Sequence, residues 1–176
     1  MPTFAEYLAY QAPPNRRDEL IHGEIVLSPS PSRRHQDLCH QIQKLLEAAV
    51  SLDYVVRLDT TMKLGIREGP RPDVFVIDKR RWVASDEHSG LPEGSPQLVV
   101  EVKSESNSWP ELLEKKDLYL SDAHCLAVWI IDPDPRTVHL YDRAGCRIFD
   151  SRTSISVPEA LGKGNIGVED IFSGIV

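Results

Sequence analysis

The sequence predicts a mixed α/β (α+β) fold in which a central β-sheet is flanked by helices and extended by β-hairpins. Several short apolar runs are separated by turn signals, which is typical of strands. Two longer segments, 33–51 and 108–120, carry the residue spacing or the start signals of helices. Strands and helices alternate along the chain, as in α/β and α+β domains. A length of 176 residues fits a single domain, 1–176, with its core at about 19–150.

The first thirty residues predict a short helix followed by a hairpin. Thr3 and Glu6 have the spacing of a capping box, so a helix is expected from Thr3 to about Tyr10. Residues 19–28 then place His22-Gly23 between two apolar runs, which indicates a tight turn between two strands.

The next stretch predicts a long amphipathic helix and two strands. After a Ser/Pro loop, residues 33–51 form the helix, and strands are expected over 54–64 and 71–78, separated by a turn at 68–70. The helix should lie on the sheet because its apolar residues recur at three- and four-residue steps. These residues are Leu38, Ile42, Leu45, Leu46 and Ala49.

The second half predicts a strand, a helix and a further central strand after a loop. Residues 82–96 are polar and rich in Gly, Pro and Ser, so they are interpreted as a loop or lid. A strand over 97–104 is followed by a helix over 108–120, whose Pro110 lies in the first turn. The strand over 126–132 is continuously apolar and should be buried on both faces.

The last part of the chain predicts a second hairpin. The runs TVHLYD and CRIFDS are expected to pair across Arg143-Ala144-Gly145. The tail over 154–176 is weakly patterned and predicts no definite element.

Composition narrows the class of protein. Twenty basic and twenty-seven acidic residues give a net charge of −7, which disfavours non-specific binding to polyanions. The three cysteines have no zinc-ligand spacing and are expected to be reduced thiols. No apolar run approaches the roughly 18 residues that span a membrane, and the N-terminus lacks the pattern of a signal peptide. We therefore expect a cytoplasmic protein that is not in the membrane.

An acid and an amine share one face of an otherwise apolar strand. Glu101 and Lys103 are two residues apart, so their side chains point to the same side. Burying either charge alone would cost several kcal/mol, so each needs a partner. An ion pair at the edge of the sheet is the simplest explanation.

A second explanation includes Asp73. If its strand pairs with the strand of Glu101, two carboxylates and an amine meet at one edge of the sheet. Close carboxylates repel each other, and a divalent cation with hard oxygen ligands removes that repulsion. Mg²⁺ takes one or two carboxylates plus waters, and Lys103 would then stabilise negative charge beside it.

Five stretches occur in an order that resembles the Uma-two family of restriction endonuclease-like proteins. Asp73 with Glu101-Val102-Lys103 is similar to the PD-(D/E)xK signature of restriction-type nucleases. The resemblance covers roughly residues 4–150. The stretches are LIHGEIVLSPSPSRRHQ, RPDVFVID, LVVEVKSES, EKKDLY and LAVWIIDPD.

The resemblance implies a restriction endonuclease-like core and roles for individual residues. Asp73 and Glu101 match metal-binding acids, and Lys103 matches the catalytic lysine. Glu24 matches an early glutamate that could be a third metal ligand, and His35 matches a recurrent histidine. Two further matches lie on the helix after the motif strand, Lys115 and Tyr119.

The implied activity is that of a Mg²⁺- or Mn²⁺-dependent nuclease whose products carry a 5′ phosphate. The expected partner is nucleic acid, with DNA favoured, and the chain is expected to act as a homodimer on duplex DNA. The alternative is a catalytically inactive module that keeps the fold for nucleic-acid binding or for dimerisation.

Overall fold

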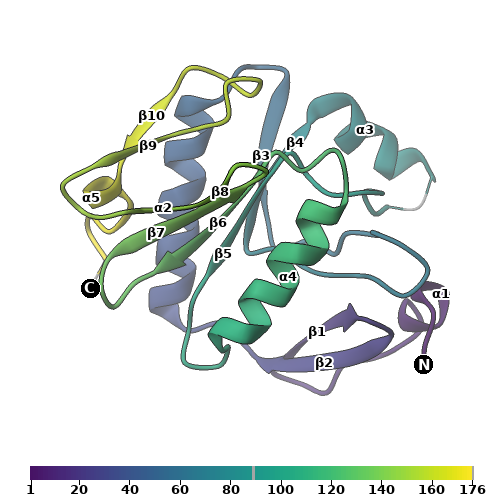
Figure 1. Ribbon diagram of the computed structural model, residues 1–176. Helices are drawn as coiled ribbons and strands as arrows, with labels where there is room; N and C mark the ends of the chain where they lie inside the picture. Colours follow the sequence, from purple (N-terminus) through teal and green to yellow (C-terminus); the bar gives the residue numbers. More distant parts are fainter. Residues whose placement is uncertain (89, 176) are drawn as a thin grey trace.

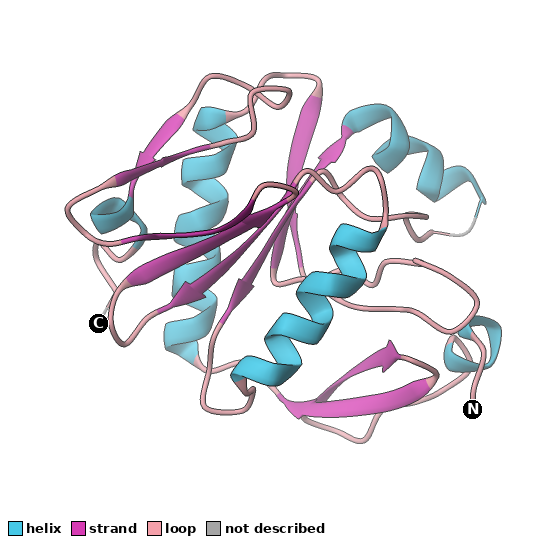
Figure 2. Ribbon diagram, viewed as in Figure 1, coloured by secondary structure: helices cyan, strands magenta, loops and turns pink. Residues whose placement is uncertain are grey.

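The short apolar runs form a mixed β-sheet. The computed structural model describes residues 1–88 and 90–175, and within them the central sheet has six strands in the order β3-β4-β5-β6-β7-β8 (Figures 1 and 2). β5 and β6 are parallel, and all other neighbours in this sheet are antiparallel. The predicted fold class is confirmed. The strands are β3 Tyr54–Leu58, β4 Val74–Asp78, β5 Leu98–Val102, β6 Ala127–Asp132, β7 Thr137–Asp142 and β8 Gly145–Phe149.

Two helices cover opposite faces of this sheet. α2 (Arg33–Ala49) lies on one face and α4 (Trp109–Ser121) on the other (Figure 1). α4 connects β5 to β6, as a crossover between parallel strands requires. Because both faces are covered, all six residues of β6 are buried. No helix in the described part of the chain is both long and apolar enough to cross a membrane.

The tail completes the core on the α2 face, which corrects the expectation that it forms no definite element. It contains β9 (Ser154–Ser156), β10 (Asn165–Gly167) and the short helix α5 (Val168–Ile171). Its apolar residues are separated by turns, so they have no regular period that the sequence would reveal. They nevertheless pack with α2 and the sheet: Ile155, Val157, Leu161, Ile166, Val168, Ile171 and Phe172.

The N-terminal elements agree with the sequence patterns. Strands β1 (Arg16–Ile21) and β2 (Glu24–Pro29) form the predicted hairpin. His22 and Gly23 have φ of 51° and 75°, so the turn uses the left-handed conformation that glycine adopts easily. The preceding helix α1 (Phe4–Tyr7) is shorter than expected, but its capping box is present.

Two segments differ from the predictions. The helix α3 (Lys79–His88) follows β4 directly and occupies part of the segment 82–96, for which the sequence predicts a loop or lid. The carboxylate of Asp78 accepts hydrogen bonds from the N–H groups of Arg80 and Arg81, which satisfies donors at the helix start. β3 ends at Leu58 instead of running to residue 64, because Asp59 has a φ of 48° that leaves the strand conformation.

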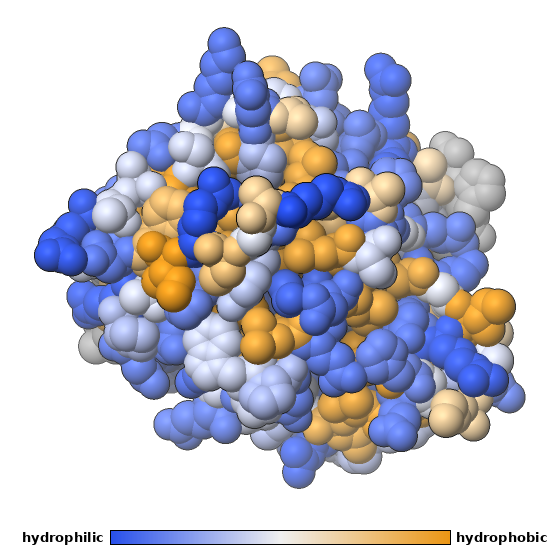
Figure 3. All heavy atoms as spheres, viewed as in Figure 1, coloured by the Kyte–Doolittle hydropathy of each residue, from blue (hydrophilic) through white to orange (hydrophobic). Residues whose placement is uncertain are grey.

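The surface is mostly hydrophilic. Over the face shown in Figure 3, hydrophilic side chains interleave with smaller apolar areas. The large apolar side chains of the central strands instead point into the two layers between sheet and helices.

Candidate active site

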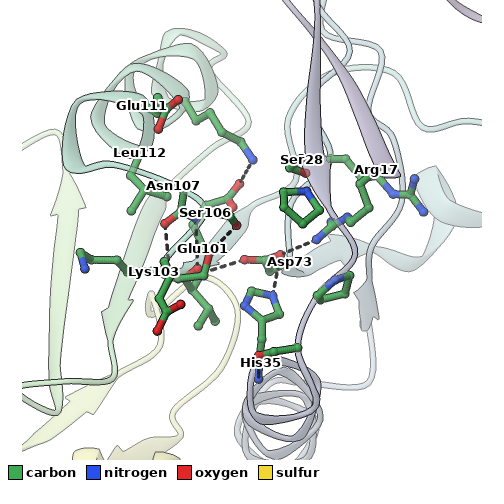
Figure 4. Close-up of a pocket in the computed structure, with 18 of the residues that line it drawn as sticks. Arg17, Ser28, His35, Asp73, Glu101, Lys103, Ser106, Asn107, Glu111 and Leu112 are labelled. Atoms are coloured by element: carbon green, nitrogen blue, oxygen red, sulfur yellow. Dashed lines mark hydrogen bonds and ion pairs between the residues drawn. The ribbon is translucent and has the colours of Figure 1, made fainter. Parts of the chain in front are cut away.

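A pocket of about 650 Å³ lies where the β1–β2 hairpin meets the ends of α2, β5 and α4 (Figure 4). Each of these elements contributes polar side chains from a different part of the sequence. The pocket therefore collects groups that are far apart in the sequence. They include Arg17, Glu19, His35, Asp73, Glu101 and Lys115.

Asp73 lies directly before β4 and is only 6% exposed. Its Oδ2 accepts a hydrogen bond of 2.8 Å from the N–H of Val102, where β4 and β5 separate. Its Oδ1 lies 3.1 Å from His35 Nε2 and 3.2 Å from Arg17 Nη1. Burial by itself would raise the pKa of Asp73, but the His35 hydrogen bond and the charges of His35, Lys115 and Arg17 hold that pKa well below its usual range.

Glu101 is 2% exposed and lies on the face of β5 that α4 covers. The Tyr119 hydroxyl donates a hydrogen bond of 2.9 Å to its Oε1. Burial raises the pKa of Glu101 to about 7; Lys115 opposes this shift, and the charges of Asp73 and Glu19 add to it. The pKa values of the two carboxyl groups are therefore moved in opposite directions, a pattern found at catalytic sites but also in structural clusters.

Lys115 supplies the ammonium group of this cluster. Its Nζ lies 2.8 Å from Glu101 Oε1 and 2.9 Å from Glu19 Oε1. Burial would lower the pKa of Lys115, but the charges of Glu101, Glu19 and Asp73 raise it above its usual value, so the amine stays charged. Lys115, which the resemblance marks as accessory, is thus in contact with the buried acids.

Lys103 does not join this cluster. It lines the pocket, but its side chain points away from Asp73 and Glu101 (Figure 4). The alternation rule places Glu101 and Lys103 on one face, but β5 ends at Val102, so the rule stops one residue short of the lysine.

Glu19, and not the expected Glu24, is the acid that joins Asp73 and Glu101 around Lys115. Glu24 is exposed beside the hairpin turn, where it pairs with Ile21, and is not among the residues that line the pocket. Glu19 is paired with Val26, farther from the turn, and lines the pocket. Its Oε1 also accepts a hydrogen bond of 2.6 Å from the N–H of Arg71.

Sequence reasoning missed Arg17 and Glu19, although a signal was present. They are two residues apart on β1, so both side chains lie on one face of the hairpin. Arg17 contacts Asp73 and also forms an ion pair with Asp59, which in turn contacts Arg71. The hairpin is a two-stranded sheet of its own, and the bridge between Leu20 and Gly69 attaches it to the turn before β4; no local pattern encodes this contact.

The donor set suits a hard divalent cation. Asp73 and Glu101 offer carboxylate oxygens in one pocket, and Mg²⁺ typically takes one or two carboxylates and keeps several waters. Around the pocket, carboxylates outnumber lysines and arginines, so a cation would also reduce unfavourable negative charge. Within the described residues, a group of three possible ligands is formed by His35, Cys39 and Asp73, whose ligand atoms lie within 4.8 Å of one another.

Comparison with known proteins relates the chain to a protein family and to a solved structure. A family model described as "Uma2: Putative restriction endonuclease" matches residues 4–166. A crystal structure from Anabaena variabilis ATCC 29413, described as "a putative nuclease belonging to DUF820", superposes with a TM-score of 0.85, covers 100% of both chains and shares 20% sequence identity. At this identity the likeness shows a common fold. No curated protein matches the chain.

Proposed function

Because the chain belongs to the Uma2 family, we propose that it is a metal-dependent nuclease that hydrolyses phosphodiester bonds of nucleic acid, with DNA as substrate and Mg²⁺ or Mn²⁺ as metal. The observation that carries this proposal is the pair of buried carboxylates, Asp73 and Glu101, in one pocket with the ammonium of Lys115, whose side chain is 14% exposed. Buried charges of this kind are costly to maintain, and active sites are a common reason for keeping them.

Asp73 and Glu101 are the residues that would hold the metal. A bound divalent ion supplies two effects at such a site, a lower pKa for coordinated water and polarisation of a phosphoryl oxygen. Lys115 and Tyr119 both contact Oε1 of Glu101, so they hold this oxygen in place, and Glu101 would hold the cation with the oxygen that these contacts do not use.

Asp73 is held in a similar way. The N–H of Val102 fixes one oxygen, and His35 and Arg17 contact the other. His35 is therefore a positioning residue in this proposal. The contacts keep Asp73 ionised, which a metal ligand requires.

Lys115 is the proposed electrostatic catalyst. Its ammonium is held between Glu101 and Glu19 at the wall of the pocket. A fixed positive charge at this point would stabilise the negative charge that develops on a phosphate oxygen during hydrolysis. Glu19 has the role of holding the amine in place.

Binding of the nucleic-acid backbone is assigned to basic residues of the pocket that are outside the carboxylate cluster. Lys103 points away from the two acids, and Arg34 also lines the pocket. Because the chain has a net charge of −7, these few contacts must provide most of the attraction, so binding should weaken with salt with a shallow slope that reflects their small number.

A cleavage assay tests the proposal. The purified chain is incubated with plasmid DNA, single-stranded DNA and RNA in parallel, with Mg²⁺, Mn²⁺ or a chelator. We expect metal-dependent cleavage of DNA that is lost in Asp73→Ala and Glu101→Gln and retained in Glu24→Gln, a matched change of an exposed acid.

Two outcomes would contradict the proposal. Equal cleavage by all variants would assign the activity to a contaminant. Absence of cleavage of any substrate by folded protein at millimolar metal would favour the alternative, an inactive module that binds nucleic acid or dimerises.

A further inference from the structure

His35, Cys39 and Asp73 form a compact group of three different ligand types. His35 and Cys39 are four residues apart on α2, so they lie on one face of the helix, one turn apart. Asp73 approaches that face from the start of β4, and one ligand atom from each residue lies within 4.8 Å of the others. The nuclease proposal uses the carboxylate and the imidazole but gives no role to the thiol.

The chemistry of this group differs from that of the two carboxylates. A thiolate and an imidazole are soft or borderline ligands that favour Zn²⁺, whereas Mg²⁺ prefers oxygen ligands. One Cys, one His and one carboxylate would occupy three corners of a tetrahedral zinc site and leave the fourth to water. His35 and Asp73 both line the pocket, so this fourth position can be reached from solvent.

We propose that His35, Cys39 and Asp73 bind Zn²⁺ or a similar thiophilic divalent ion, and that this ion excludes the catalytic metal because both need Asp73. The proposed binding site rests on the distances between the three ligand atoms alone. The inhibitory consequence rests on the proposed nuclease function.

Small side-chain shifts would bring the three ligand atoms to the spacing of a zinc site. For bonds of about 2.0–2.3 Å, the ligand atoms of a tetrahedral zinc site lie roughly 3.3–3.8 Å apart, and those present here fall within 4.8 Å. Oδ2 of Asp73 can keep its hydrogen bond from Val102 while Oδ1 turns to the ion. Arg17 would give up Oδ1 and keep its ion pair with Asp59.

Binding releases the proton of the thiol and, where His35 is protonated beside Asp73, the proton of its imidazolium as well. Cys39 is 6% exposed, and burial raises the pKa of its thiol, so the sulfur carries its proton before the ion arrives. As the metal–sulfur bond forms, the S–H bond breaks and the proton passes to solvent, with no change of oxidation state. The neutral thiol lets the site remain empty without a further buried negative charge.

Cobalt spectroscopy on the whole chain tests the binding site. Co²⁺ replaces Zn²⁺ with similar ligands and gives a near-ultraviolet charge-transfer band only when a thiolate is bound. We expect this band in the wild-type protein, its loss on adding Zn²⁺, and its absence in Cys39→Ser and Cys39→Ala. Two control variants, Cys125→Ser and Cys146→Ser, should keep the band.

Two results would overturn the proposal. The first is a folded wild-type protein without a thiolate band at saturating Co²⁺. The second is a band that survives in Cys39→Ser and disappears in Cys146→Ser. Calorimetry separates this failure from failure of the nuclease proposal, because Cys39→Ser should keep Mn²⁺ binding. For inhibition, we expect Zn²⁺ to reduce Mn²⁺-dependent cleavage by the wild type and to have a much smaller effect on Cys39→Ser; equal inhibition of both would refute the shared use of Asp73.

Discussion

The Nζ atom of Lys115 lies 2.8 Å from Oε1 of Glu101, so an amine on α4 neutralises the acid at the end of β5. The motif-based expectation gave this task to Lys103, whose side chain points away. The two lysines are twelve residues apart in sequence but line the same pocket. The lysine that touches the acid is thus carried by the helix and not by the strand.

Replacing Lys115 and Lys103 one at a time by methionine distinguishes the roles of the two lysines. In Lys115→Met, we expect cleavage to fall by on the order of 10²–10³-fold, because a fixed charge near the developing negative charge is lost. Lys103→Met should mainly weaken DNA binding and make its salt dependence shallower, because one contact with a phosphate is lost. Rates and unfolding curves are measured together, since removing Lys115 also leaves buried acids unpaired. A reversed order of the two rate effects would reject the assignment to Lys115.

Tyr119→Phe removes one hydrogen bond to Glu101 and little else. The hydroxyl is buried and donates 2.9 Å to Oε1. We expect the free energy of unfolding to fall by about 1–3 kcal/mol, because a buried acceptor loses a donor. Tyr141→Phe, which alters a partly exposed ring, serves as the control in chemical denaturation. Equal effects of the two changes would show that the Tyr119 hydroxyl contributes nothing specific.

The raised pKa of Glu101 predicts how stability depends on pH. The folded chain holds this proton up to a pKa of about 7, whereas the ordinary value is 4.5. Stability from this group is therefore fully present below pH 4.5 and is lost as the pH rises through 7. The loss is on the order of 3 kcal/mol, since each pKa unit corresponds to about 1.4 kcal/mol.

Denaturant unfolding between pH 5 and 6 measures this contribution for Glu101. His35 also has a raised pKa, but its stability contribution changes mainly above its ordinary value of 6.5. Burial lowers the pKa of His139, so this group makes stability rise with pH in the same window, but it does so in wild type and variant alike. The difference between the two proteins therefore reports Glu101. We expect wild-type stability to fall across the window and Glu101→Gln to show a flatter slope. An unchanged slope in the variant would mean that another group titrates there.

The C-terminal tail should contribute measurably to stability. Leu161 is fully buried in the cluster on the α2 face. Leu161→Ala is expected to cost about 2–5 kcal/mol, because it removes methyl groups and leaves a cavity. Ile148→Ala, at a site 63% exposed on β8, should cost much less in the same thermal or chemical unfolding experiment. A small effect at Leu161 would contradict the packing of the tail.

The sequence predicts the central elements because their patterns are strong and local. The run in β6 is apolar at nearly every position, and α2 has a clear apolar stripe. By contrast, α3 consists mostly of polar residues and has no such stripe, so its capping by Asp78 was the only local signal. The tail segments β9 and β10 are three residues each, too short for periodicity to identify them.

The site is predictable only where two neighbouring apolar strands determine it. Asp73 and Glu101 follow from the pairing of β4 with β5, and the register Val74↔Val100 brings the Asp73 carboxylate to the N–H of Val102, next to Glu101. The choice between Glu19 and Glu24, and between Lys115 and Lys103, depends on how the hairpin and α4 dock on the sheet. That docking is tertiary packing, which local patterns do not specify.

The central claim is that Asp73 and Glu101 share one hard cation. A crystal of the protein soaked in Mn²⁺, analysed by anomalous scattering, tests it most directly. The account predicts one peak within bonding distance of both carboxylates, with Lys115 still on Oε1 of Glu101. Ordered carboxylates with no peak between them at saturating Mn²⁺ would contradict it.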